Sequence, residues 1–353
     1  MKVLIPDHIK NEFIDRIREI LPKSDIERLV VDKKVPVFWR VLSVLAFHLP
    51  FYGFYRWVRR RSEEKTRYKF SIPGKKPAGI LSDAEVFLAT WVFDERMMKE
   101  LIPRLPSLRW IHSTKTGVEH IVPALEKRED ITLTHIGNLH SNRIAEFVIG
   151  VILSIAKNIP DHIALFRKRQ WKVLPSRMTA DVIVGIIGLG NIGSKIAAYA
   201  KTLRMHVMAI DNVQKTDEHV DRFFLMDGLN DFLSQADFIV LSCPLTSETK
   251  DLIGTAQLEV MRKSAWLINV ARGEIVNEAD LIKTLKDKEI AGACLDVCNE
   301  EPLPISYPFY RLDNVLITHH SAFAQEGVSK EIIETFLVQL SKYRSKEHET
   351  CLK

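Results

Sequence analysis

The chain has 353 residues, of which 46% are hydrophobic and 27% are charged, and its formal net charge is +5. This length exceeds that of one ordinary core, so we expect two domains, and a core of this size needs neither disulfides nor a structural metal ion. The mild positive charge suits a small acidic substrate and does not indicate binding to nucleic acid.

The first part of the chain is expected to alternate strands with helices. Residues 3–5 form a short apolar run typical of a buried strand, and apolar residues at helical spacing follow between residues 13 and 21. Further strands are expected at residues 79–81, 86–88 and 108–112. A long, mostly apolar helix is predicted from about residue 144 to 159, where Pro160 is expected to bound it.

The pattern changes at VIVGIIG, a continuous apolar run over residues 182–188 that predicts a strand buried on both faces. A helical pattern follows at residues 191–203, and an amphipathic helix is predicted near the C-terminus at residues 332–340. Five more strands are expected, at residues 206–210, 238–241, 265–269, 292–297 and 315–318. Because helical patterns lie between most of these strands, we predict an α/β fold with a doubly wound parallel sheet of the Rossmann type.

Cysteine usage and the N-terminal residues bear on the compartment. The four cysteines, Cys243, Cys294, Cys298 and Cys351, form no C-x-x-C pair, so we predict free thiols and neither a metal site nor a redox pair. The N-terminal MKVLIPD shows no secretory signal, and no run of about 18 apolar residues occurs. We therefore expect a cytoplasmic protein.

The GLGNIG motif at residues 188–193 follows the buried strand and opens the next helix. In this context Gly188 allows a tight turn, Gly190 lets the backbone approach a pyrophosphate, and Gly193 permits close packing of helix on sheet. Asn191 and Ile192 would open a helix whose free N–H groups face the phosphates. The motif therefore predicts a dinucleotide cofactor.

Asp211 ends the strand that follows this helix. A carboxylate at this position accepts hydrogen bonds from the ribose hydroxyls of the adenosine and repels a 2′-phosphate. We therefore predict NAD(H) rather than NADP(H) as the cofactor, with Lys215 close enough to weaken the discrimination.

Ionisable residues cluster at the ends of three later strands, where ligands bind in open parallel sheets. Arg272 suits a substrate carboxylate because its planar guanidinium binds it with two hydrogen bonds. His319 and His320 offer an imidazole that can exchange a proton with a carbonyl oxygen. Asp296 and Glu301 offer carboxylates, one of which can orient the imidazole. This combination predicts hydride transfer between the dinucleotide and a 2-oxo or 2-hydroxy acid.

At this point the sequence resembles the D-isomer-specific 2-hydroxyacid dehydrogenase family, which includes phosphoglycerate dehydrogenases and glyoxylate or hydroxypyruvate reductases. The resemblance extends over about residues 108–325. It is carried by WIHSTKTGVEHI, IAEFVIGVILSIAKNI, VGIIGLGNIG, CPLTSETKDLIG, LINVARGEIVNEADLI and AGACLDVCNEEPLP.

The resemblance implies roles for individual residues. Arg272 matches the arginine that binds the substrate carboxylate, Glu301 the carboxylate paired with the histidine, and His320 the acid/base histidine. Asp296 matches the aspartate near the nicotinamide amide. The family's substrate loop, with amides that face the substrate, matches Lys115, Thr116, Gly117 and Val118, and further cofactor contacts match Pro244 and Thr249.

The resemblance also implies the domain organisation. We expect a split, flavodoxin-like substrate domain at residues 1–140 and 321–353, with an NAD-binding Rossmann domain at residues 141–320 inserted in it and the active site in the cleft. A homodimer through the nucleotide domain is common in the family. One departure from the pattern is His319, which stands where the family usually has proline before the catalytic histidine.

A second departure is an insertion at about residues 31–75, which matches nothing in the family. Its apolar, aromatic-rich stretch at residues 41–55 is too short to span a bilayer and is broken by Pro50 and Gly53, and an arginine cluster follows at residues 56–61. We favour packing on the substrate domain or a dimer contact over a substrate lid, partner site or contact with a membrane surface.

Two other functions fit parts of the pattern. An NAD-sensing, corepressor-like binding protein would keep this fold and can also keep Arg272, Glu301 and His320. A turnover assay distinguishes such a protein from an enzyme. Formate dehydrogenase resembles the family but typically carries glutamine where Glu301 stands, so that interpretation is disfavoured.

Overall fold

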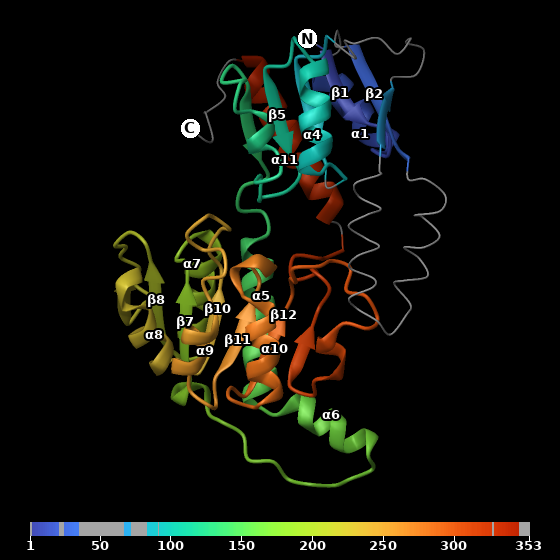
Figure 1. Ribbon diagram of the computed structural model, residues 1–353. Helices are drawn as coiled ribbons and strands as arrows, with labels where there is room; N and C mark the ends of the chain where they lie inside the picture. Colours follow the sequence, from blue (N-terminus) through green and yellow to red (C-terminus); the bar gives the residue numbers. More distant parts are fainter. Residues whose placement is uncertain are drawn as a thin grey trace. The chain divides into compact units, whose positions relative to one another are not determined.

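The computed structural model describes residues 2–20, 25–34, 67–71, 83–90, 92–326 and 328–345. The chain divides into two compact units, which are described separately (Figure 1). Unit 1 comprises Met1–Leu139 and Glu326–Lys353, and unit 2 comprises His140–Gln325. The second boundary falls after Gln325 rather than after residue 320, because Asp296 accepts hydrogen bonds from the amides of Ser321 and Ala322, and the Ala322 side chain packs in the core of unit 2.

Unit 1 is a parallel sheet with one antiparallel strand at its edge. The described strands follow the order β3-β2-β1-β4-β5-β6, and only the pair β2–β3 is antiparallel. The strands are β1 (Lys2–Pro6), β2 (Asp25–Lys34), β3 (Arg67–Ser71), β4 (Val86–Ala89), β5 (Trp110–Ser113) and β6 (Thr132–His135). The helices are α1 (Asn11–Ile20), α4 (Glu95–Leu101) and α11 (Val328–Ser345).

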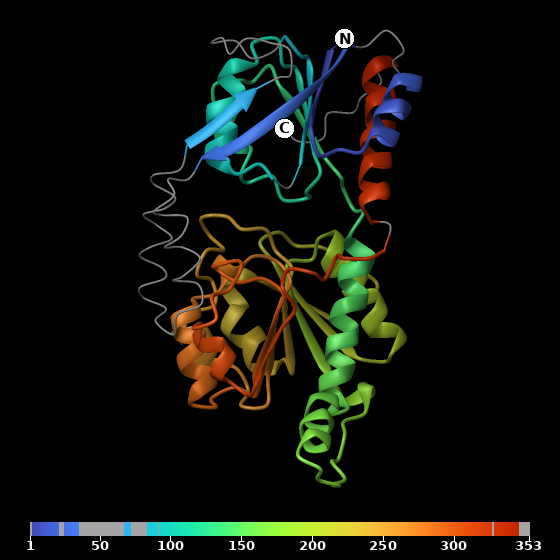
Figure 2. The same cartoon turned by 90° about the vertical axis from the view of Figure 1, so that its right-hand side faces the viewer.

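Both faces of this sheet are covered, as Figure 2 shows with α1 and α11 on one face and α4 on the other. Successive side chains of β4 alternate between these two cores, so Val86 and Leu88 pack with α1 and α11, whereas Phe87 packs with α4. Trp110 is 1% exposed, and its indole N–H donates to the Thr134 hydroxyl at 2.8 Å. Burial on both faces explains why these strands read as apolar runs.

The insertion contributes in part to this sheet. Its first residues extend β2 to Lys34, and β3 pairs with them in the register Val30↔Ser71 to Lys34↔Arg67. Residues 35–66 and 72–82 lie outside the described residues, as do the apolar stretch, the arginine cluster and the strand expected at residues 79–81.

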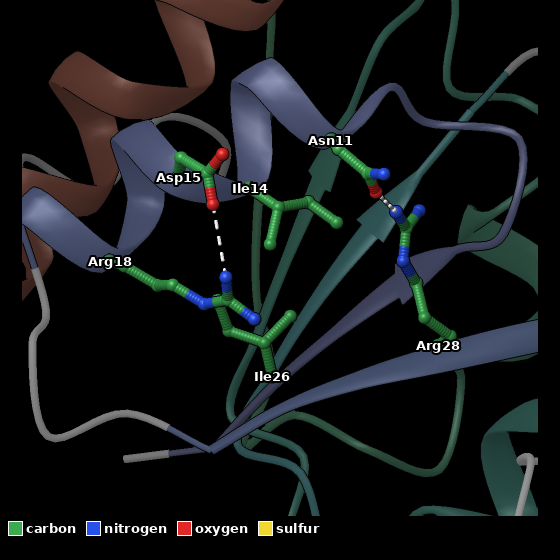
Figure 3. A pocket seen from close by; sticks show the side chains of 6 residues that line it. All are labelled: Asn11, Ile14, Asp15, Arg18, Ile26 and Arg28. Atoms are coloured by element: carbon green, nitrogen blue, oxygen red, sulfur yellow. Dashed lines mark hydrogen bonds and ion pairs between the residues drawn. The ribbon is translucent and has the colours of Figure 1, made fainter.

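A surface pocket of about 340 Å³ lies between α1 and β2 (Figure 3). Its Arg28 guanidinium donates to the carbonyl oxygen of Ile9 at 2.6 Å and to the side-chain oxygen of Asn11 at 2.8 Å. The guanidinium of Arg18 faces Asp15, with 3.0 Å between the bonded atoms. Arg28 thus ties the loop before α1 to β2, whereas Arg18 pairs with a carboxylate of its own helix, so we assign this pocket a structural role.

Unit 2 is a parallel sheet in the order β13-β12-β11-β10-β7-β8-β9. The strands are β7 (Ile183–Ile187), β8 (His206–Asp211), β9 (Arg222–Leu225), β10 (Phe238–Leu241), β11 (Trp266–Asn269), β12 (Gly292–Leu295) and β13 (Val315–Ile317). The helices are α5 (Ser141–Ala156), α6 (Ile159–Arg167), α7 (Asn191–Thr202), α8 (Leu229–Gln235), α9 (Thr255–Val260) and α10 (Glu278–Lys286). Strand order reverses between β7 and β10, which is where open sheets of this kind bind ligands.

Helices cover both faces of this sheet as well. Helices α5 and α7 pack together on one face, and α10 lies on the opposite face (Figures 1 and 2). The core between α5, α7 and the sheet includes Val148, Ile152, Ile196 and Val184, each 0% exposed. The doubly wound parallel sheet predicted from the alternating pattern is therefore confirmed.

The long helix predicted up to Pro160 is two helices. Helix α5 ends at Ala156, and α6 begins at Ile159 with a bend of 59° between them. Asn158 adopts φ 54° at the break, and Pro160 lies in the first turn of α6, where its missing N–H costs nothing. Among the described residues no single helix has the length and apolarity to cross a membrane, although this bent pair meets both criteria together.

Candidate functional site

The glycine motif forms a tight turn between β7 and α7. Gly188 has φ +93°, and a Cβ atom there would lie 2.6 Å from the Cys243 nitrogen. A Cβ atom on Gly193 would lie 2.3 Å from the carbonyl oxygen of Gly188. Larger residues at these two positions would therefore force the turn apart.

Gly190 differs because no heavy atom lies within 4 Å of where its Cβ would be. It is the N-terminal cap of α7, whose first residues are Asn191 and Ile192. The first amides of a helix have no acceptor inside that helix, and the helix dipole is positive at this end. Open space beside these amides fits a dinucleotide pyrophosphate.

Asp211 lies beside this turn, and its contacts go beyond those expected. Its Oδ2 accepts the Leu189 amide at 2.9 Å and the Lys215 ammonium at 2.6 Å, and its Oδ1 accepts the Asn212 amide at 2.9 Å. Burial would raise the pKa of Asp211, but these donors outweigh burial and hold that pKa below its usual value. Asp211 is therefore an anion already paired with a cation.

The loop after β10 runs next to the glycine turn. The Ser242 hydroxyl donates to the Gly188 carbonyl at 2.8 Å, which places Pro244 nearby along the chain. The Thr249 hydroxyl donates to the Pro244 carbonyl at 2.7 Å and accepts the Thr246 amide at 2.7 Å. The Thr249 hydroxyl thus stabilises its own loop, and its contact with a cofactor stays a prediction.

Arg272 follows β11 and is held by its neighbours. The Asn269 side-chain amide donates to the Arg272 carbonyl at 2.8 Å, and the Arg272 guanidinium donates to the Ala271 carbonyl at 2.7 Å. A Cβ atom on Gly273 would lie 2.2 Å from the carbonyl carbon of Cys298. The arginine loop is therefore pressed directly against the loop that follows β12.

That second loop carries Glu301, which pairs with His320. Glu301 Oε2 lies 2.8 Å from His320 Nδ1, and Glu301 Oε1 accepts the Cys298 amide at 2.9 Å. Burial would raise the pKa of Glu301, but the histidine, this amide and the Arg272 charge together lower it. Glu301 is thus held as a carboxylate that orients the imidazole, as the pairing expected from the sequence requires.

The histidine loop is an unusual backbone segment. His319 and His320 both adopt φ +55°, a conformation that costs non-glycine residues roughly 1–3 kcal/mol and is found at functional sites. The His320 amide donates to the Asp296 carbonyl at 2.6 Å. The Asp296 carboxylate accepts the Thr318 hydroxyl at 2.6 Å and the Ser321 amide at 2.8 Å. Among the described residues, the His319 side chain makes no hydrogen bond or ion pair.

Asp296 therefore has a structural part that sequence reasoning missed. It is 4% exposed, and it bonds to residues on both sides of the two histidines. Contact with the nicotinamide amide stays a prediction for this residue. The signal that would have indicated the anchor is a buried aspartate at the end of one strand facing threonine and serine at the end of the next.

Glu278 was also missed. It is 7% exposed, its Oε1 accepts the Asn299 amide at 2.7 Å, and its Oε2 accepts the Tyr307 hydroxyl. Burial raises the pKa of Glu278, although both donors oppose that shift. Glu278 is the first residue of α10. It was missed because acidic residues are common in the first turn of a helix, where they favour the positive end of the helix dipole.

The predicted substrate loop belongs to unit 1 and is described by itself. It follows β5, and the Lys115 amide donates to the Ser113 hydroxyl at 3.1 Å. The Thr116 hydroxyl donates to the Gly137 carbonyl at 3.3 Å, and Val118 packs against the core under α4. Gly117 lies between these two anchors, so the loop has a defined course at the end of its strand.

The thiols and metal ligands of the described residues add no further site. Cys243, Cys294 and Cys298 are free and buried, and burial raises the pKa of Cys243 to about 11 and that of Cys294 to about 12. Cys351 lies outside the described residues. In the described part of the chain no group of three or more His, Cys, Asp or Glu residues can hold a metal ion.

Comparison with known proteins adds to this geometry. Residues 149–322 match the model of the NAD-binding domain of D-isomer-specific 2-hydroxyacid dehydrogenases. Glyoxylate reductase from Pyrococcus horikoshii is 32% identical over 275 residues, which cover 74% of this chain and 81% of that protein. Glycerate dehydrogenase from Methylorubrum extorquens is 35% identical over 257 residues, covering 69% of this chain and 77% of that protein. The chain belongs to the D-isomer-specific 2-hydroxyacid dehydrogenase family.

Solved structures agree on the fold of this D-2-hydroxyacid dehydrogenase. A family member from Xanthobacter autotrophicus, in complex with NADPH and MES, matches with a TM-score of 0.75 and 23% identity, covering 99% of this chain and 98% of that one. The chain is thus an oxidoreductase of 2-hydroxy and 2-oxo acids that uses a nicotinamide cofactor. The family and the enzyme class predicted from the sequence are confirmed.

Proposed function

We propose that this dehydrogenase reduces a small 2-oxo acid to the D-2-hydroxy acid, and catalyses the reverse reaction, with NADH preferred over NADPH. The observation that carries the proposal is the 2.8 Å contact between His320 Nδ1 and Glu301 Oε2, made next to the arginine loop. An imidazole, a carboxylate that orients it and a guanidinium are the groups that this reaction needs.

In the proposed reduction Arg272 binds the substrate carboxylate through two parallel hydrogen bonds. When bound, the nicotinamide supplies the hydride. His320 donates a proton from Nε2 to the carbonyl oxygen as negative charge develops there, while Nδ1 stays bonded to Glu301. In oxidation the neutral His320 takes the hydroxyl proton instead.

The other site residues predicted from the sequence have supporting roles in this proposal. The backbone amides of Lys115, Thr116, Gly117 and Val118 are proposed to face the substrate carboxylate. The cofactor contacts are proposed to come from Gly188, Gly190, Asn191, Ile192, Gly193, Asp211, Pro244, Thr249 and Asp296. The open space at Gly190 supports the pyrophosphate end of this assignment.

We also propose that the protein forms a homodimer through residues 159–175, the segment that begins with α6. No residue of α6 is buried, and Phe166, Trp171 and Val173 are 82%, 100% and 84% exposed. The segment is anchored at its base, where the Asn158 side chain donates to the Pro175 carbonyl at 2.7 Å. Large apolar side chains on a defined arm of a nucleotide-binding unit suit a second copy of the same surface.

Light scattering on a sizing column tests the dimer. The wild type should have twice the chain mass, and Trp171→Glu should be monomeric with unchanged circular dichroism. A monomeric wild type at micromolar concentration would contradict the proposal.

The reaction is tested by NADH oxidation with glyoxylate, hydroxypyruvate, pyruvate and bulkier 2-oxo acids. At least one small 2-oxo acid should turn over, and Arg272→Ala should abolish that turnover while NADH still binds. Binding of NADH without turnover of any 2-oxo acid would instead favour a cofactor-sensing protein.

A further inference from the structure

The cofactor preference is expected to depend on more than Asp211, because that carboxylate is not alone. The Lys215 ammonium lies 2.6 Å from Asp211 Oδ2 and 3.1 Å from the Leu189 carbonyl oxygen. Leu189 lies inside the GLGNIG turn. The lysine therefore connects the glycine turn to the end of β8. In the proposed function, the glycine turn holds the pyrophosphate and the end of β8 holds the adenosine ribose.

The two members of this ion pair differ in burial and in the number of backbone amides that hold them. The Asp211 side chain is 13% exposed and is fixed by the amides of Leu189 and Asn212. The Lys215 side chain is 39% exposed and reaches the carboxylate along a flexible four-carbon stem. A ligand that competes for this pair would therefore move the lysine and leave the aspartate in place.

This asymmetry has opposite consequences for the two cofactors. NADH has free hydroxyls on its adenosine ribose, which donate hydrogen bonds to Asp211. These bonds are strengthened by the carboxylate charge, which Lys215 partly neutralises. A 2′-phosphate would meet an uncompensated Asp211 with like charge, but the Lys215 ammonium can turn toward it and offer a cation and three donors.

We propose that Lys215 is a second determinant of cofactor choice, one that lets this enzyme accept NADPH despite Asp211. The inference rests on the proposed function for the location of the adenosine ribose. Lys215 narrows the preference for NADH over NADPH that Asp211 sets, and it does not reverse that preference. The next acidic side chain along the loop, Asp217, accepts the His219 amide at 3.0 Å.

The test is the affinity of the purified enzyme for NADH and for NADPH, measured separately by fluorescence titration without substrate. Lys215→Met keeps most of the side-chain length and removes the charge. The ratio of the NADPH to the NADH dissociation constant should rise about tenfold, equal to about 1.4 kcal/mol, with the NADH constant equal to that of wild type or up to about twofold lower. Raising the salt concentration should weaken NADPH binding less in the variant than in wild type.

Lys201→Met is the matched control. Lys201 pairs with Asp221 at 2.7 Å, and that carboxylate also accepts a backbone amide, from Val207 at 2.8 Å. This variant should leave the ratio unchanged. Lys215→Gln repeats the test if the methionine variant folds poorly.

A rise of threefold or more in the ratio supports the assignment, and a smaller change, or an equal loss for both cofactors, overturns it. The proposed reaction fails in a different way. If the wild type binds both dinucleotides but reduces no 2-oxo acid, the reaction is wrong, while the two dissociation constants still decide the role of Lys215.

Discussion

Replacing Glu301 with Gln removes the charge beside the catalytic histidine and keeps the size of the side chain. The contacts of this carboxylate include His320 Nδ1 at 2.8 Å and the Cys298 amide at 2.9 Å. An amide has one oxygen, so it can accept only one of these donors and turns its NH₂ group toward the other. Glu301→Gln should therefore lower the free energy of unfolding by about 1 kcal/mol.

The larger effect is expected on the pH dependence of reduction, which needs a protonated His320. The pKa of Glu301 is lowered, so its charge is present at neutral pH and is lost only as the pH falls through that lowered value. A charge-assisted hydrogen bond contributes about 1.5–3 kcal/mol, which we discount to about 1.4 kcal/mol because the side chains of Glu301 and His320 are 39% and 46% exposed. An energy of that size corresponds to about a tenfold change in rate.

Paired profiles of kcat/KM against pH measure this effect for both directions. With Glu301→Gln, the high-pH limb of reduction should move to lower pH, and the rising limb of oxidation should move with it. NADH affinity, measured by titration at each pH, should not change. A reduction limb that stays in place in the variant would show that Glu301 does not favour the protonated histidine, and the reasoning would be refuted.

Four further predictions concern single side chains. Arg272→Ala should lower kcat/KM by at least a hundredfold and raise the KM of the 2-oxo acid. Arg272→Lys should restore activity only in part, because an ammonium cannot form the two parallel hydrogen bonds of a guanidinium. Activity of Arg272→Ala within a few-fold of wild type would contradict the binding of the substrate carboxylate by Arg272. His320→Ala should remove most activity with NADH binding intact, whereas His319→Ala should keep it; the opposite result would assign the proton to His319. Asp211→Ala should narrow the NADH preference seen in cofactor titrations. Tyr307→Phe should lower the unfolding free energy by about 1–2 kcal/mol in denaturant titration, since Glu278 loses a buried donor.

Much of the nucleotide-binding unit was predictable because its strands are buried on both faces. Such strands read as continuous apolar runs, and GLGNIG marks the turn after the first of them. The contact between Glu301 and His320 was predictable because the two residues follow β12 and β13. These strands are adjacent and parallel, so their carboxyl ends meet at one edge of the sheet. The edge strand β9 was missed because its residues are partly exposed and carry no such run.

The features that escaped prediction depend on tertiary contacts. The break between α5 and α6 lies at Asn158, because a proline in a first turn begins a helix rather than ending one. Asp296 reads as a ligand contact until its bonds to the histidine loop are seen. Strand β3 pairs with β2 only across the long insertion, and pairing at such separation leaves no local signal.

The proposed reaction and its proton donor are tested together by the product of one reaction. The 2-oxo acid that turns over fastest among those with a chiral product is incubated with NADH and with the wild type or His320→Ala, and NADH loss is followed together with chiral analysis of the 2-hydroxy acid formed. We expect one D-2-hydroxy acid per NADH oxidised by the wild type and almost none with the variant, although both bind NADH. Formation of the L-isomer, or equal turnover by the variant, would contradict the proposal.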